Sequence, residues 1–179
     1  MKHSLIVLFA VLFFISCTSN SGNTDDMTAK ADSSKAEKVE SKEERNKKII
    51  KEGTAALNDH DFDRLTSLMT DDAVENGDGS GHAVKGRDSI NASMKKFFSS
   101  FPDFKGEDFR YYADGDNVVV TATYSGTFKK DMGKMKANGK SFKFQDADIF
   151  TLNDEGKITS HRYIQPDATM MSQISGMKK

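Results

Sequence analysis

The chain of 179 residues has little of what several classes of protein need. It contains a single cysteine, so an intrachain disulfide is impossible. Its formal net charge is −1, which gives no electrostatic reason to expect nucleic acid as a partner. Its long apolar run, Leu5 to Ile15, is too short to span a bilayer. The length leaves room for one modest domain with appendages.

The first residues have the shape of a secretory signal, because Lys2 and His3 precede the apolar run and Cys17 follows it. The stretch from Phe14 to Cys17 resembles the lipobox of bacterial lipoproteins, although leucine is usual at the place of Phe14. In that family the cysteine is acylated and becomes the mature N-terminus. We therefore expect a lipoprotein signal over residues 1–17, lipidated at Cys17. The alternative for this cysteine is a small buried hydrophobe.

The resemblance implies a protein of the bacterial cell envelope, anchored in a lipid bilayer and facing the periplasm or the exterior. Residues 18–44 are rich in Ser, Thr, Asn, Asp, Ala, Glu and Lys. Such a segment buries too little apolar surface to offset the entropy of ordering, so we predict a disordered tether. The folded domain is expected over residues 45–177.

Three helices are predicted in the first half of that domain. Apolar residues recur at helical spacing over residues 43–58, and Asp61 is placed to cap a short second helix. A third helix opens at Arg87 and ends at Pro102. The acidic residues around His60 suggest metal ligands, but their position at a helix start favours capping. In the glycine-rich loop 71–86, with a short strand at 73–75, His82 either lines a cavity mouth or is solvated.

Strands are predicted to follow. Residues 104–112 and 117–128 form a hairpin, and a basic loop over 129–140 carries Met132 and Met135. That loop is either a solvated connection or a lip whose methionines adapt to an apolar ligand and whose lysines attract an anionic one. A short helix over 168–176 closes the chain. The alternation favours an antiparallel sheet with one covered face.

The stretch 141–165 organises the domain as a strand, a turn over Asn153 to Gly156, and a second strand. Alternation places two carboxylates, Asp146 and Asp148, on the face that also carries phenylalanines. The register set by this turn predicts Asp148 opposite Arg162. His161 and Tyr163 would then lie on the other face, unless a β-bulge turns them over.

Several short motifs together resemble one family. They are, in chain order, NDHDFD (58–63), DDAV (71–74), KGRDSI (85–90), FSSFPD (98–103), MG (132–133), NGK (138–140), DIF (148–150) and GKI (156–158). This order is similar to that of the SnoaL-like polyketide cyclases, also called ester cyclases, of the nuclear transport factor 2-like superfamily. The resemblance covers about residues 47–174.

The resemblance implies an α+β fold, a cone in which a curved antiparallel sheet wraps around three helices and encloses a pocket, commonly in a homodimer. It implies intramolecular aldol ring closure of a polyketide ester, with an aspartate as proton shuttle and no metal or cofactor. Asp148 of the DIF motif and His161 match the family's motifs. The family continues its histidine with Trp-Asp, whereas this chain has Arg162 and Tyr163.

Three functions remain open at this point. The first is an enzyme, a cyclase or isomerase with Asp146 or Asp148 as base and His161 or Tyr163 as donor to the developing enolate. The second is a lipid-anchored receptor for a small apolar or anionic molecule, and the third a dimeric interaction module. The side chains expected to line the ligand site are Tyr124, Met132, Met135, Phe144, Phe150, Arg162 and Tyr163. An ion pair between Arg162 and Asp148 would hold the carboxylate ionised and make it a poor proton shuttle.

Overall fold

The computed structural model describes residues 40–175, which belong to one compact unit. The expected signal, Cys17 and most of the expected tether lie outside these residues. Helices and strands follow in the order α1 (Lys42–Asn58), α2 (Phe62–Ser67), β1 (Met69–Glu75), β2 (Val84–Lys85), α3 (Arg87–Phe98), β3 (Lys105–Asp114), β4 (Asn117–Thr127), β5 (Ser141–Leu152), β6 (Ile158–Tyr163) and α4 (Asp167–Ser175). Within the described range no helix is long and apolar enough to cross a membrane.

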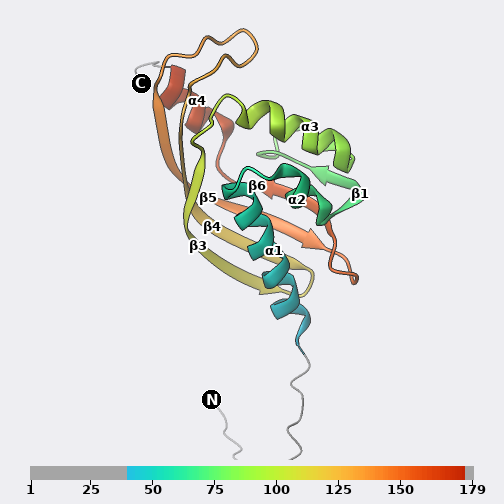
Figure 1. Ribbon diagram of the computed structural model, residues 1–179. Coiled ribbons are helices and arrows are strands. Elements are labelled where there is room, and N and C mark those ends of the chain that lie inside the picture. The colour runs from blue at the N-terminus through green and yellow to red at the C-terminus, as the bar shows by residue number, and fades with distance from the viewer. Residues whose placement is uncertain (1–39, 176–179) are drawn as a thin grey trace, which may run out of the picture. The chain divides into compact units, whose positions relative to one another are not determined.

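The strands form one six-stranded sheet in the order β2-β1-β6-β5-β4-β3. The pairs β3–β4, β4–β5 and β5–β6 are antiparallel, as alternation predicted. The prediction of a wholly antiparallel sheet is wrong at one place, because β1 runs parallel to β6. This pairing places a strand from the first half of the domain beside one near its end, and the curved sheet keeps an α+β architecture (Figure 1).

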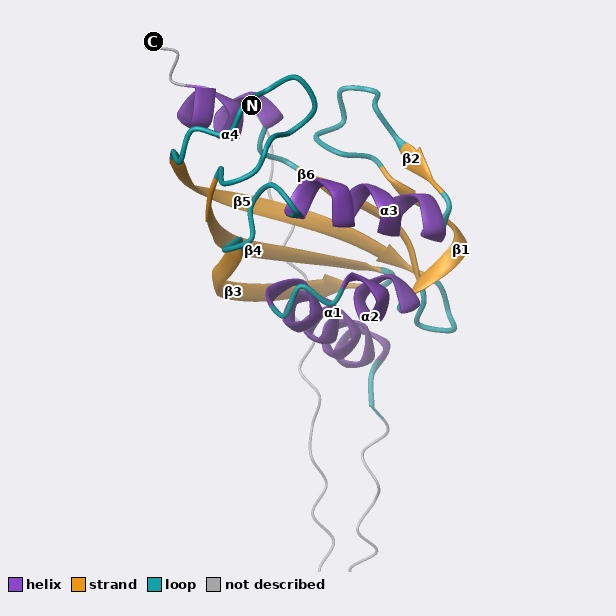
Figure 2. Cartoon of the chain, turned by 45° about the horizontal axis from the view of Figure 1, so that its top comes forward, coloured by secondary structure: helices purple, strands orange, loops and turns teal. Residues whose placement is uncertain are grey.

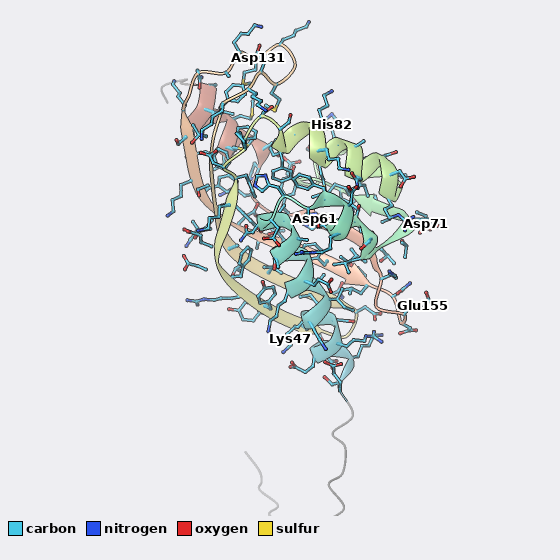
Figure 3. The ribbon with its side chains drawn as sticks, in the orientation of Figure 1. Lys47, Asp61, Asp71, His82, Asp131 and Glu155 are labelled. Carbon is cyan, nitrogen blue, oxygen red and sulfur yellow. The ribbon has the colours of Figure 1, made fainter. Side chains whose placement is uncertain are left out.

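The helices α1, α2 and α3 lie on one face of the sheet (Figures 1 and 2). Ser41 caps α1 by accepting from the Glu44 N–H, so the helix begins inside the range assigned to the tether. Asp61 caps α2 through the Arg64 N–H at 3.0 Å, which confirms the predicted capping role. Asp61 lies at the start of α2, and His82 lies exposed on the loop between β1 and β2 (Figure 3).

Two hydrophobic clusters fill the space between this face and the helices. One centres on Ile50 of α1 and Ile90 of α3, packed against Val118 and Val120 of β4. The other is aromatic and is closed by Met170 and Ile174 of α4. Its further buried members are Phe101, Phe104, Ala122, Tyr124, Phe128 and Phe142. The even-numbered residues of β4 therefore point towards the helices, and β5 presents its own even-numbered residues to the same side because Val120 pairs with Asp148.

The register between β5 and β6 differs from the prediction. The turn forms as expected, with Gly156 in the left-handed region at φ 78°. A bulge then follows, because Leu152 pairs with Ile158 whereas Thr151 pairs with Ser160. The extra residue turns over the rest of β6, so the predicted Asp148–Arg162 pair is wrong. Asp148 pairs with Tyr163 instead.

Candidate functional site

Asp148 is the buried acid of the inner sheet face, with only 7% of its surface exposed. The Tyr124 hydroxyl donates to its Oδ2 at 2.6 Å from the neighbouring strand β4. His161 Nε2 lies 3.1 Å from its Oδ1, from strand β6 on the other side. Both oxygens of the carboxylate therefore have a partner, which offsets the cost of burying a charge.

His161 lies between two carboxylates. Its Nδ1 is 2.5 Å from Glu75 Oε2 of β1, while its Nε2 faces Asp148. Glu75 and His161 are Cα partners in the parallel β1–β6 pairing, and the other Glu75 oxygen accepts from the Gly77 N–H at 2.9 Å. A hydrogen-bonded chain of four side chains thus runs across the inner face from Glu75 through His161 and Asp148 to Tyr124.

The environment of these groups changes their ionisation. Burial alone would lower the pKa of His161, but the Glu75 charge and the hydrogen bonds to both carboxylates raise it to about 10. Burial, followed by the negative charge of Asp148, raises the pKa of Tyr124 well above its usual range. At neutral pH we therefore expect an imidazolium and a neutral phenol in this chain of contacts.

Two aromatic residues flank the imidazole. The Phe150 ring stacks on His161 with centroids 4.4 Å apart, and the Tyr163 ring lies 6.3 Å away at a tilt. The Tyr163 hydroxyl donates to Asp167 Oδ1 at 2.7 Å, so it is already engaged. Burial and the bond to Asp167 raise the pKa of that hydroxyl.

Asp146 has a different environment, although it is on the same strand. Its Oδ1 accepts from the backbone N–H groups of Ala147, Ile164 and Gln165, at 2.7, 3.2 and 2.8 Å. Burial raises the pKa of Asp146, its bond from Gln165 opposes that shift, and the charge of Asp148 adds to it. The carboxylate fastens the segment after β6 to β5, which is a structural use of the group.

The remaining predicted site residues are dispersed. Arg162 pairs with Ile149 and is exposed, so it does not contact Asp148. Met132 and Met135 bridge each other within the loop between β4 and β5 and pack against the aromatic cluster. Phe144 packs on the edge of the same cluster, 5.6 Å from the Phe142 ring. Of the residues predicted for the site, the structure joins Tyr124, Asp148, Phe150, His161 and Tyr163.

Space around the sheet is unevenly distributed. A narrow gap lies beside Glu75 and His161, with Ile90 of α3 among its walls, and it has no room for a water molecule. A hollow of about 800 Å³ is lined by residues such as Thr121, Thr123 and Gln145. These alternate with the inward-facing residues of β4 and β5, so the hollow lies on the opposite side of the sheet from Asp148.

Glu75 is the functional candidate that sequence reasoning missed. Its strand was predicted as a short element in a glycine-rich loop, and no local pattern indicates a parallel pairing with β6. Among the described residues there is no cluster of three or more His, Cys, Asp or Glu side chains arranged to hold a metal ion. The NDHDFD stretch instead caps α2 and, through Asp63, contacts Lys95 of α3.

Comparison with known proteins identifies the family. The family model of the SnoaL-like polyketide cyclases matches residues 48–174. The chain belongs to this family. No curated protein sequence matches it. The match covers nearly all of the described unit, including the four hydrogen-bonded side chains Glu75, His161, Asp148 and Tyr124.

Solved structures support the same fold for this SnoaL-like chain. A candidate polyketide cyclase from Xanthomonas campestris has a TM-score of 0.68 at 20% identity, over 75% of this chain and 99% of that one. A candidate SnoaL-like polyketide cyclase from Jannaschia also has 0.68, at 24% identity over 76% and 95%. A protein with a ketosteroid isomerase-like fold from Catenulispora acidiphila has 0.59, at 19% identity over 71% and 92%. At these identities the structural similarity establishes the fold alone.

Proposed function

We propose that this SnoaL-like domain moves a proton on a carbonyl-containing small molecule, as a cyclase or isomerase that needs no metal or cofactor. The observation that carries the proposal is the placement of Asp148, a carboxylate held on the inner face between the Tyr124 hydroxyl and the His161 imidazolium. The two donors position this base before the substrate arrives, which favours proton transfer. They also hold it ionised and lower its basicity, as an Arg162 ion pair would have done, so the reaction depends on the same imidazolium stabilising the enolate.

In this reaction the Asp148 carboxylate takes a proton from the carbon next to a carbonyl group. The C–H electron pair becomes the enolate, whose carbon attacks a second carbonyl carbon of the same molecule. The alkoxide formed then recovers the proton from Asp148. Tyr163 donates to Asp167, so His161 is the better donor to the developing enolate oxygen. Once Asp148 is protonated, it holds the His161 Nε2–H less strongly, which frees that donor.

A second candidate is a binding protein without turnover. Both oxygens of Asp148 are engaged, and the gap beside His161 has no room for a water molecule, whereas small-molecule sites have volumes of roughly 300 to 1,000 Å³. Phe97, Phe144 and Phe150 are only partly buried, so these rings are the ones that would move to admit a substrate. If they stay in place, the open hollow on the outer face is the better ligand site.

Incubation of the chain from Glu40 onwards with polyketide methyl esters and ketosteroids separates the candidates. We expect turnover that Asp148→Asn lowers by about 100-fold or more. Asp72→Asn removes the same charge from an exposed position of β1 and should leave turnover unchanged. Saturable binding without product would support the receptor, and turnover that survives Asp148→Asn would exclude this base.

We further propose that Cys17 is acylated and anchors the domain in a membrane of the cell envelope. The run from Leu5 to Ile15 followed by this cysteine supports the proposal. The test is fractionation of cells that produce wild type or Cys17→Ser. We expect wild type in the membrane fraction and the variant in the soluble fraction. Equal amounts of both in the membrane would contradict the lipid anchor.

A homodimer through the outer face of the sheet is also proposed. Tyr112 and Ile164, the most exposed large apolar residues of the described unit, support it because both lie on that face. Sedimentation of wild type beside Ile164→Glu tests it. A dimer that the substitution converts to monomer is expected, and a wild type that sediments as a monomer at all concentrations would overturn the proposal.

A further inference from the structure

The contact between Glu75 and His161 determines the charge that the imidazole carries. Both imidazole nitrogens face carboxylate oxygens, Nδ1 at 2.5 Å and Nε2 at 3.1 Å. An ionised carboxylate only accepts hydrogen bonds, and a neutral imidazole carries a single N–H. A neutral ring would therefore set one bare nitrogen against an oxygen lone pair, whereas an imidazolium satisfies both contacts.

We propose that Glu75 is a positioning residue that keeps His161 as a doubly hydrogen-bonded imidazolium, which makes His161 a proton donor and leaves Asp148 as the base. This inference rests on the proposed function for its catalytic meaning, but the charge state of His161 can be measured without any substrate. Without Glu75, the ring could remain neutral and still donate from Nε2 to Asp148.

Among the described residues, Glu75 and Asp148 are the charged side chains that contact the ring, and Glu75 is the one at Nδ1. From β1 the ring meets Glu75, from β5 it meets Asp148 and the stacked Phe150, and Tyr124 of β4 lies behind Asp148. On its own strand the neighbouring titratable ring is Tyr163, which bonds to Asp167, and Arg162 is exposed. From α3 the side chain that lines the narrow gap beside His161 is the apolar Ile90.

Glu75 is itself held in place by the backbone. Its Oε1 accepts from the Gly77 N–H, and the Asn76 N–H donates to the His161 carbonyl oxygen at 2.8 Å. The segment around Glu75 is thus bonded to His161 both through the main chain and through the side chain. A carboxylate bonded to one ring nitrogen of a histidine fixes the orientation of the ring.

The charge balance explains what this arrangement does for the reaction. At rest, Glu75, His161 and Asp148 carry charges of −1, +1 and −1, so together they are anionic. When Asp148 accepts the substrate proton, the three become neutral while the substrate becomes an enolate. The new anion therefore faces a neutral group of side chains that contains an imidazolium. With a neutral imidazole the same step would leave a net negative charge beside the enolate, which is less favourable.

Titration of His161 in the full chain by NMR tests this inference, with the signal assigned from the spectrum of His161→Gln. We expect wild type to show both ring N–H groups and no titration between pH 6 and 9. Glu75→Gln should lower the midpoint by about one pH unit or more, because it removes the nearest charge. Asp72→Asn, which removes a charge from the same strand, should leave the midpoint unchanged. Glu75→Asp should lower the midpoint by less than Glu75→Gln does.

The inference is overturned by a wild-type His161 that titrates with an ordinary midpoint near pH 6.5. It is also overturned if Glu75→Gln leaves the midpoint where it is in wild type. If Glu75→Gln does not fold, the comparison of wild type with Glu75→Asp provides the test. The inference then requires a protonated His161 ring in wild type and a lower His161 midpoint in Glu75→Asp. Loss of turnover in Asp148→Asn plays no part in this test, so a failure here is separate from a failure of the proposed reaction.

Discussion

Glu75 and Tyr124 lie at opposite ends of one row of four hydrogen-bonded side chains and do not contact each other. Glu75 contacts His161 Nδ1 at 2.5 Å, and Tyr124 donates to Asp148 Oδ2 at 2.6 Å. The two residues come from β1 and β4, strands separated by β6 and β5 in the sheet. A substitution at Glu75 therefore leaves the Tyr124–Asp148 hydrogen bond in place, and a substitution at Tyr124 leaves the Glu75–His161 contact in place.

Stability should depend on pH through His161. Although burial opposes it, the carboxylates raise the pKa of this group in the folded state to about 10, from 6.5. Its contribution is therefore fully present below about pH 6.5 and is lost as the pH rises to about 10, on the order of a few kcal/mol. Urea unfolding of wild type and Glu75→Gln at pH 7 and pH 10 checks this. The difference in unfolding free energy should shrink at pH 10, and a constant difference would contradict the assignment.

Tyr124→Phe should destabilise the fold by about 1.5 to 3 kcal/mol, because Asp148 loses a hydrogen bond to its buried charge. The ring itself is retained and can still stack on Phe104, 5.5 Å away between centroids. Tyr112→Phe provides the matched control, since that side chain is 55% exposed and should change stability by less than about 0.5 kcal/mol. Equal effects in chemical denaturation would indicate that the Tyr124 hydroxyl contributes nothing specific.

The bulge in β6 predicts unequal effects for two neighbouring residues. Arg162 is exposed and away from Asp148, so Arg162→Ala should change stability by no more than about 0.5 kcal/mol. His161→Gln leaves the buried Asp148 and the partly buried Glu75 without a cation between them and should cost about 3 to 5 kcal/mol. Thermal unfolding of both variants measures the two losses of stability. A larger loss in Arg162→Ala than in His161→Gln would favour the register without a bulge.

Gly106 should resist replacement by alanine. A Cβ atom at this position would lie 2.4 Å from Phe109 Cζ and 2.9 Å from Tyr124 Cε1, so both rings would have to move. We expect Gly106→Ala to cost about 1 to 3 kcal/mol and to weaken the Tyr124–Asp148 contact. Gly115→Ala is the comparison, because nothing lies within 4 Å of its Cβ position and only its left-handed backbone at φ 54° opposes the change. Unfolding free energies and the NMR signal of the Tyr124 hydroxyl are the readouts.

Local patterns were sufficient for most of the elements. The helical spacing of apolar residues over 43–58 predicted α1, the cap at Asp61 predicted α2, and alternation in 141–152 predicted which residues of β5 face inward. These features depend on neighbours within a few positions of the chain, where periodicity and capping carry the information.

The partners of Asp148 could not be obtained in the same way. The register expected from the turn paired it with Arg162, and one bulged residue after the turn exchanged that partner for Tyr163 and brought His161 onto its face. No feature of the motif in 148–150 records this shift, because a bulge is decided by how the strand packs on both of its neighbours.

The sequence by itself determined the order of the helices and of every strand except the short β2, the acids of the inner face and the family. Only the tertiary structure decided that Glu75 lies against His161, since the parallel pairing of β1 with β6 joins residues 86 positions apart. Such a contact depends on packing the whole sheet around the helices. Local periodicity fixes where a side chain points along its own strand, but the neighbouring strand depends on how the complete chain buries its apolar surface.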